Sequence, residues 1–144
     1  MRIEKHIESL KEVIDEIQSA LQDPKGLQAH QRRLALMLSV GIADLIELYF
    51  HRLGIMKPGA KIKHNWFKRK DIKERLKRQI TGDITKVEKI DEIMEKSKQI
   101  EHDRNDMAYG SPLNDELLLK QKIDEFLEIK KLIEKLTGEK IEFK

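Results

Sequence analysis

Apolar residues recur along this chain at the spacing of helices. In residues 2–22 they follow alternating steps of four and three, at Ile3, Ile7, Leu10, Ile14, Ile17 and Leu21. This spacing gathers them into one stripe on a helix whose other faces carry mainly Glu and Lys. Similar stripes return in residues 83–103 and in the last segment, which runs to about Leu136. The pattern therefore predicts long amphipathic helices in these three segments.

Residues 34–53 differ, because apolar side chains cover nearly the whole circumference of the expected helix. A helix of this kind is buried at the centre of a core. A membrane span would need about 20 predominantly apolar residues, and charged residues such as Asp44 and Glu47 interrupt this stretch. We therefore expect a central helix over residues 27–53 of a soluble protein. Gly41 costs that helix about 1 kcal/mol, which predicts the close approach of a neighbouring helix from this chain or a second copy.

Turn signals separate the expected helices. The residues at 23–26 include Pro24 and Gly26, which end the first helix and return the chain through a short connection. Residues 54–70 form the longest segment without helical periodicity. Asp71, followed three residues later by Glu74, has the pattern of a capping box and predicts a short helix.

The start and the end of the last helix also have signals. Ser111 and Pro112 are typical of an N-cap and a first-turn proline, and Gly138 is typical of a helix C-terminus. The sequence thus predicts an all-α protein with one domain, 1–144. Its expected architecture is a four-helix up-and-down bundle, with an extra short helix between the second and fourth helices.

Composition excludes several classes of chemistry. The chain has no cysteine, which excludes a disulfide framework, a thiolate zinc site and a cysteine nucleophile. None of the five histidines has Glu three residues before it, as a carboxylate-bridged metal site in a helical bundle would require. There is no glycine-rich phosphate loop and no signal-peptide pattern. We expect a cytoplasmic protein that has no cofactor, no bound metal and no association with a membrane.

The charges are unevenly distributed. Residues 61–78, here called the basic segment, contain nine lysines and arginines against two acids, whereas the net charge of the whole chain is +3. In one interpretation this segment binds nucleic acid: its cations contact phosphates, and Trp66 or Phe67 stacks on a base. In the other, which we favour for the aromatics, Trp66 and Phe67 pack on the core and the cations are merely solvated. The candidate nucleic-acid-binding residues are His64, Lys68, Arg69 and Lys70.

The turn that ends the fourth expected helix carries Arg104 and Asn105, and Tyr109 follows after three further residues. In this setting the turn resembles the motif of the HEPN superfamily of helical bundles: Arg, a polar residue, three variable residues and then His. Tyr109 occupies the place of the His. A competing interpretation is structural, because a cation and an Asn also suit the C-terminus of a helix.

The resemblance implies a fold, a chemistry and an assembly. Members of the superfamily are dimers that bring two motifs into one cleft. In ribonuclease members the His transfers a proton and the Arg stabilises the phosphate, without a metal. A tyrosine has a reference pKa of about 10 and is a poor base at neutral pH. His102 is a conceivable replacement, so the candidate catalytic residues are His102, Arg104, Asn105 and Tyr109.

Three functions follow as hypotheses. The first is a non-catalytic HEPN-like homodimer that binds RNA or nucleotide, or that is the partner of a small nucleotidyltransferase. The second is a metal-independent endoribonuclease of the toxin–antitoxin or defence type that uses Arg104 in a dimer cleft. The third is a helical scaffold without a ligand. We rank the first highest because Tyr109 stands where the motif has His.

Overall fold

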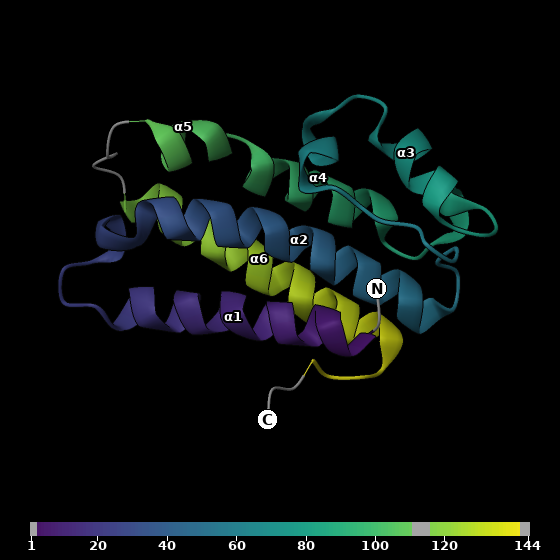
Figure 1. Ribbon diagram of the computed structural model, residues 1–144, viewed down its shortest axis with the longest axis horizontal. Coiled ribbons are helices and arrows are strands. Elements are labelled where there is room, and N and C mark those ends of the chain that lie inside the picture. The colour runs from purple at the N-terminus through teal and green to yellow at the C-terminus, as the bar shows by residue number, and fades with distance from the viewer. Residues whose placement is uncertain (1–2, 111–115, 142–144) are drawn as a thin grey trace.

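The computed structural model describes residues 3–110 and 116–141, which form helices and turns without a strand. The all-α class expected from the sequence is confirmed (Figure 1). The α-helices are α1 (Ile3–Gln22), α2 (Gln31–Leu53), α3 (Ile72–Gln79), α4 (Ile90–Glu101), α5 (Arg104–Tyr109) and α6 (Glu116–Thr137). Short 3-10 helices are η1 (Leu27–His30), η2 (His64–Lys68) and η3 (Ile84–Lys86).

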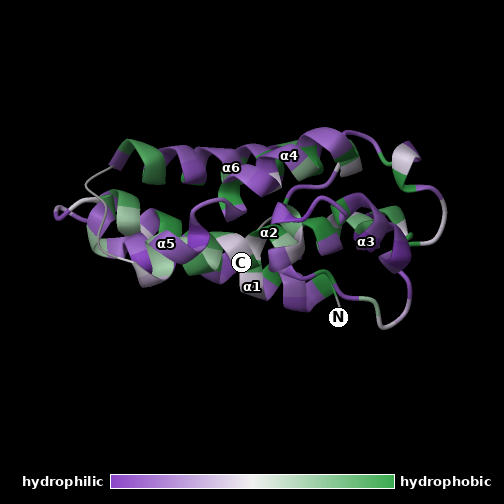
Figure 2. Cartoon of the chain, turned by 90° about the horizontal axis from the view of Figure 1, so that it is seen from above, coloured by the Kyte–Doolittle hydropathy of each residue, from purple (hydrophilic) through white to green (hydrophobic). Residues whose placement is uncertain are grey.

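Helix α2 is the centre of the arrangement. It packs against α1, α5 and α6, while α4 packs against α6 and η2. In Figure 1, α1 lies along one side of α2, and α4 and α5 lie along the other, with α3 at one end. The long helices carry both hydrophobic and hydrophilic residues in Figure 2, as amphipathic helices around a shared core must.

The expected burial of the central helix is confirmed. Residues 41–50 are all buried, and Leu45, Ile46 and Phe50 have no exposed surface. The stretch Leu27–Leu53 is long and apolar enough to cross a membrane, but 72% of its most apolar window is buried inside the fold. Burial of that extent fits a core helix.

Gly41 lies where three helices meet. A Cβ atom at this position would lie 2.8 Å from Cε2 of Phe126 on α6 and 3.1 Å from Cγ2 of Val13 on α1. The glycine therefore permits a close approach within this chain, as one of the two expectations had it. It no longer argues for a second copy, and the homodimer stays a prediction.

The expected helix over 83–103 is wrong at its start, although it ends close to the expected place. Its first residues form η3, in which the side chain of Asp83 accepts a hydrogen bond from the backbone N–H of Thr85 at 2.9 Å. Lys89 then adopts a left-handed conformation, with φ of 59°, so α4 begins only at Ile90. Ile84 and Val87 still reach the core, but from a tight turn instead of a helix.

The capping box at Asp71 is also wrong. Helix α3 begins at Ile72 as expected, but the Asp71 side chain makes no cap hydrogen bond. Both of its carboxylate oxygens instead accept from Nε of Arg75 at 3.1 Å, because the charged donor one turn along competes with the backbone N–H groups. The expected N-cap at Ser111 and Pro112 lies outside the described residues. Gly138, with φ of 70°, follows α6 as expected.

Candidate functional site

The Arg104 turn begins a helix instead of ending one. Helix α4 stops at Glu101, and Asp103 adopts a left-handed conformation with φ of 66°. An aspartate tolerates this conformation better than most residues. Arg104 is then the first residue of α5. The interpretation of Arg104 and Asn105 as a helix C-terminus is therefore wrong.

Arg104 keeps donors free. Its Nη1 donates to Oδ1 of the adjacent Asn105 at 2.9 Å, while its Nε is buried and has no hydrogen-bond partner among the described residues. A buried donor without an acceptor is uncommon in a folded protein. Arg104 forms no ion pair among the described residues. An anion can therefore bind to its guanidinium without first displacing a carboxylate.

The other candidate residues of the turn, His102, Asn105 and Tyr109, are exposed. Asn105 and Tyr109 are four positions apart on α5 and so lie on one face, and Tyr109 is 69% exposed. The His102 side chain is 71% exposed, and its Nε2 lies 3.5 Å from Oδ1 of Asp103. No hydrogen bond or ion pair among the described residues joins His102 to Arg104 or Tyr109. His102 and Tyr109 therefore lie at the surface, and neither is hydrogen-bonded to Arg104 as a base would be.

Helix α5 has only six residues, but it is fixed to the core by contacts with its neighbours. Met107 and Ala108 are buried against the core, and the Gln31 side chain on α2 donates to the carbonyl oxygen of Met107 at 3.0 Å. Gln31, the first residue of α2, therefore anchors the helix that carries Arg104.

The aromatics of the basic segment have structural roles. Phe67 is 2% exposed and belongs to the core, so it cannot stack on a base. Trp66 packs against the same core, and the guanidinium carbon of Arg75 lies 5.8 Å from the centroid of its ring. Together they fasten η2 to the bundle, which is the interpretation that the sequence favoured.

The cations of the basic segment are mostly unpaired. Of its nine lysines and arginines, only Lys73 and Arg75 form ion pairs among the described residues, with Asp91 and Asp71. The remaining seven include Lys68, Arg69 and Lys70, all exposed and consecutive. Positive charge that is not balanced within the chain is available to an external anion.

His64 joins the basic segment to the helices beneath it. Its Nδ1 lies 2.9 Å from Oγ of Ser39 on α2 and 3.1 Å from Oε1 of Glu101 on α4. Ser39 also donates to Oε2 of Glu101 at 2.5 Å. This is not a nucleophilic relay, because such a relay uses both ring nitrogens of the histidine and Ser39 is fully buried. The cluster places the basic segment beside Glu101, three residues before Arg104.

A polar cavity lies next to this cluster. It has a volume of about 550 Å³ and is bounded by α1, α2 and residues 61–65. Asp44 and Glu47 line it, and the buried His6 lies behind them, with Nδ1 3.1 Å from Oδ1 of Asp44 and Nε2 3.1 Å from Oε2 of Glu47. Sequence reasoning treated both carboxylates only as interruptions of an apolar helix. The available signal was His6, which falls within the apolar stripe of the first helix.

Burial perturbs the ionisable groups around His6. It raises the pKa of Glu47, whose Oε1 accepts a hydrogen bond from the backbone N–H of Ile62 at 2.5 Å. It lowers the pKa of His51, whose ring centroid lies 5.3 Å from that of His6 and whose Nε2 is buried without a partner among the described residues. No group of three or more histidine, aspartate or glutamate side chains in the described part of the chain could hold a metal ion.

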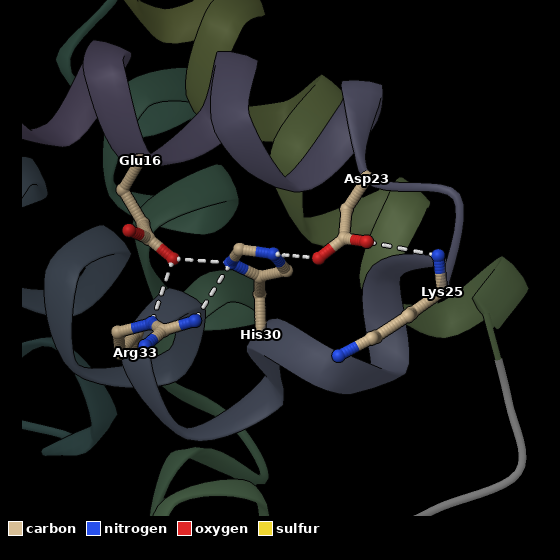
Figure 3. Close-up of polar contacts among 5 residues, drawn as sticks. All are labelled: Glu16, Asp23, Lys25, His30 and Arg33. Atoms are coloured by element: carbon tan, nitrogen blue, oxygen red, sulfur yellow. Dashed lines mark hydrogen bonds and ion pairs between the residues drawn. The ribbon is translucent and has the colours of Figure 1, made fainter.

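A second histidine cluster lies at the connection between α1 and α2 (Figure 3). The ring of His30 lies between two carboxylates, with Nδ1 2.8 Å from Oε1 of Glu16 and Nε2 2.8 Å from Oδ2 of Asp23. Arg33 also donates to Glu16, at 3.2 Å. The hydrogen bond with Glu16, followed by that with Asp23, raises the pKa of His30. The pKa of Asp23 is lowered, first by the backbone N–H of Lys25 and then by His30.

These two shifts predict a window of pH in which the His30 cluster stabilises the fold. The raised pKa of His30 adds stability below the unfolded value of about 6.5, and this stability is lost as the pH rises through the folded value. The lowered pKa of Asp23 adds stability above about 4. We expect His30→Gln to lower the melting temperature by about 3 °C at pH 6 and by clearly less at pH 9. His102→Gln, at an exposed histidine, is the control. An equal loss for His30→Gln at both values of pH would contradict the assignment.

The comparisons with known proteins give no family. No protein-family model, no curated protein and no solved structure matches the chain. What the protein does must therefore be argued from its own side chains.

Proposed function

We propose that this protein binds RNA or nucleotide phosphates without cleaving them, through the basic segment and the Arg104 turn of a HEPN-like four-helix bundle. The observation that carries the proposal is that seven lysines and arginines of the basic segment form no ion pair with another described residue. Single-stranded nucleic acid releases condensed counterions when such side chains neutralise its phosphates, and that release drives binding.

The placement of these cations supports the same conclusion. Phe67 and Trp66 hold the segment against the core, so its charged side chains are presented by a fastened loop instead of a free one. Less side-chain and backbone freedom is then lost when a ligand binds. Glu101, which contacts His64, lies close in the chain to Arg104 and its free donors. The contact of His64 with Glu101 thus connects the basic segment to the end of α4, three residues before Arg104.

The proposal leaves out cleavage for a chemical reason. A general base must lie within hydrogen-bond reach of the proton that it removes and must be unprotonated at the working pH. Tyr109 is a phenol, with a reference pKa of about 10. The exposed His102 side chain lies 3.5 Å from Oδ1 of Asp103 through its Nε2, and no hydrogen bond or ion pair among the described residues joins it to Arg104. Neither of the two residues that could replace the motif histidine therefore provides a base beside the guanidinium.

A charge-matched pair of variants tests the proposal. The triple variant Lys68→Ala, Arg69→Ala and Lys70→Ala should weaken binding of a single-stranded oligouridine by about tenfold at low salt. It should also lower the slope of log affinity against log salt by about 2, since each lost phosphate contact with a single strand removes about 0.7 from that slope. Fluorescence anisotropy across a salt series measures both quantities.

The control removes the same charge elsewhere. Lys98, Lys131 and Lys135 lie on α4 and α6 and are exposed, so the triple alanine variant at these positions lowers the net charge equally. It should retain both the affinity and the slope. Equal losses in the two triple variants would show attraction by net charge alone, and a wild-type protein that binds no oligouridine at low salt would refute the proposed function.

A further inference from the structure

The polar cavity between α1, α2 and residues 61–65 is charged in two zones. Its floor is formed by Asp44 and Glu47, both buried, and its rim includes Lys61 and Lys63. Neither of these lysines has an ion pair among the described residues. Apolar side chains line the walls between the two zones: Val40, Ala43 and Ile62. At about 550 Å³ the cavity falls within the size range of ligand pockets.

The floor can accept further hydrogen bonds. Asp44 takes one contact on each oxygen, from Nδ1 of His6 and from Oγ of Ser9, and a carboxylate has about four acceptor positions. Glu47 accepts from Ile62 through Oε1. Its Oε2 lies 3.1 Å from Nε2 of His6. Each of the four carboxylate oxygens therefore has one close contact, which leaves further acceptor positions on both buried carboxylates beside the cavity.

These contacts also fix the floor in place. His6 has no exposed surface and lies between the two carboxylates, so the side chains from α1 and α2 hold one another. The backbone N–H of Ile62 ties Glu47 to the loop that carries the rim lysines. A rigid acceptor set costs little ordering when a ligand binds, and it discriminates between ligands that offer donors and ligands that offer acceptors.

The volume and the lining residues of the cavity fit a flat heterocycle. Its faces would pack on Val40, Ala43 and Ile62, an edge bearing N–H donors would meet the carboxylates, and an anionic substituent would reach Lys61 and Lys63. Guanine has such an edge, because its N1–H and its N2 amino group are adjacent donors that match the two oxygens of one carboxylate. Adenine and cytosine place a ring-nitrogen lone pair beside their amino group. Uracil places its single N–H between two carbonyl oxygens.

We propose that this cavity binds the guanine base of a nucleotide, as a free mononucleotide or as one residue of a single-stranded RNA. The proposal rests on the function proposed above, since Lys61 and Lys63 belong to the basic segment and the phosphates would follow it. In this arrangement the unpaired cations supply affinity for any sequence, and Asp44 and Glu47 supply the preference for guanine.

Three mononucleotides test the assignment. GMP should bind at least about tenfold more tightly than IMP, which lacks only the N2 amino group, because losing one hydrogen bond to a charged group typically costs that much. AMP should bind more weakly still, since its N1 lone pair would face a carboxylate. Isothermal titration calorimetry at low salt gives the three affinities, and anisotropy compares oligouridine with the same oligomer carrying one guanosine.

Protein variants locate the site. Glu47→Gln and Asp44→Asn replace an acceptor oxygen by a donor and should abolish the preference for GMP, while leaving binding to oligouridine intact. Either change could disturb the contacts of His6, so melting temperatures are measured alongside. Val40→Trp is the second route, because Val40 is 45% exposed and lines the cavity. The larger side chain should exclude the base without disturbing the core.

The outcomes separate the two proposals. Binding of oligouridine together with equal or absent binding of GMP, IMP and AMP would overturn the guanine site and leave the proposed function standing. An unchanged preference for GMP in both Glu47→Gln and Val40→Trp would place guanine elsewhere and would also overturn it. Failure to bind any oligonucleotide would refute the proposed function. The guanine site would then fall as well unless GMP bound in preference to IMP.

Discussion

Replacing Leu45 by alanine should lower the free energy of unfolding by about 2–5 kcal/mol, the range measured when a buried leucine is truncated. Leu45 lies in the middle of α2 and has no exposed surface. Helix α2 packs against α1, α5 and α6. A cavity at this position is enclosed by several helices, so the surrounding side chains can collapse into it only in part.

The same truncation on the same helix provides the control. Leu53, the last residue of α2, is 41% exposed, and Leu53→Ala should cost less than about 1.5 kcal/mol because less apolar surface leaves the core. Urea denaturation followed by circular dichroism measures both variants. Similar midpoints for the two would mean that α2 is not the centre of the core.

The sequence predicted those parts of the fold in which the spacing of apolar residues along one helix decides which face is buried. A stripe at steps of three and four has one face to bury, and α1 therefore begins and ends close to where the pattern placed it. The nearly all-apolar stretch of α2 has no face left for solvent, so its central place followed from composition alone. Gly41 correctly predicted the close approach of a neighbouring helix, but only the structure identifies Phe126 and Val13 as the residues that approach it.

The errors in the helix boundaries arose where a residue other than glycine adopts a left-handed conformation, which its residue type does not predict. Lys89 and Asp103 both have positive φ without being glycine. The first separates η3 from α4, and the second separates α4 from α5. Periodicity continues across such a residue, because apolar side chains on either side still reach the core. The sequence therefore showed one helix where the chain forms several elements.

The sequence predicted only those parts of the candidate site whose residues are consecutive in the chain. Lys68, Arg69 and Lys70 are consecutive, and their charge is visible without a fold. The polar cavity is lined by Ser9, Asp44 and Ile62, which come from three separate segments. The contact of His64 with Ser39 and Glu101 likewise joins residues far apart in the chain. Such groupings depend on how the helices pack, and a single sequence carries no direct record of that packing.

Arg104→Ala should weaken binding of oligouridine by about 1.5–3 kcal/mol, the typical contribution of a hydrogen bond to a charged group. The reason is the state of the guanidinium before binding. Asn105 occupies one donor, Nε has no acceptor, and no acid forms an ion pair with it among the described residues. A phosphate that reaches Arg104 therefore displaces no partner. Stability should change little, because the side chain is only half-buried at the first residue of the short helix α5.

Two further variants distinguish phosphate binding from a general loss of charge or surface. Arg104→Lys keeps the charge but lacks the planar fork that binds two phosphate oxygens at once, so it should recover only part of the lost affinity. Tyr109→Phe changes an exposed side chain on the same helix and should bind as the wild type does. Anisotropy at one low salt concentration suffices for all three. If Arg104→Lys restores affinity fully, the arginine acts as a point charge, and the resemblance of its turn to a phosphate-binding motif loses its chemical basis. If Arg104→Ala binds normally, the basic segment alone holds the ligand and α5 serves only to close the bundle.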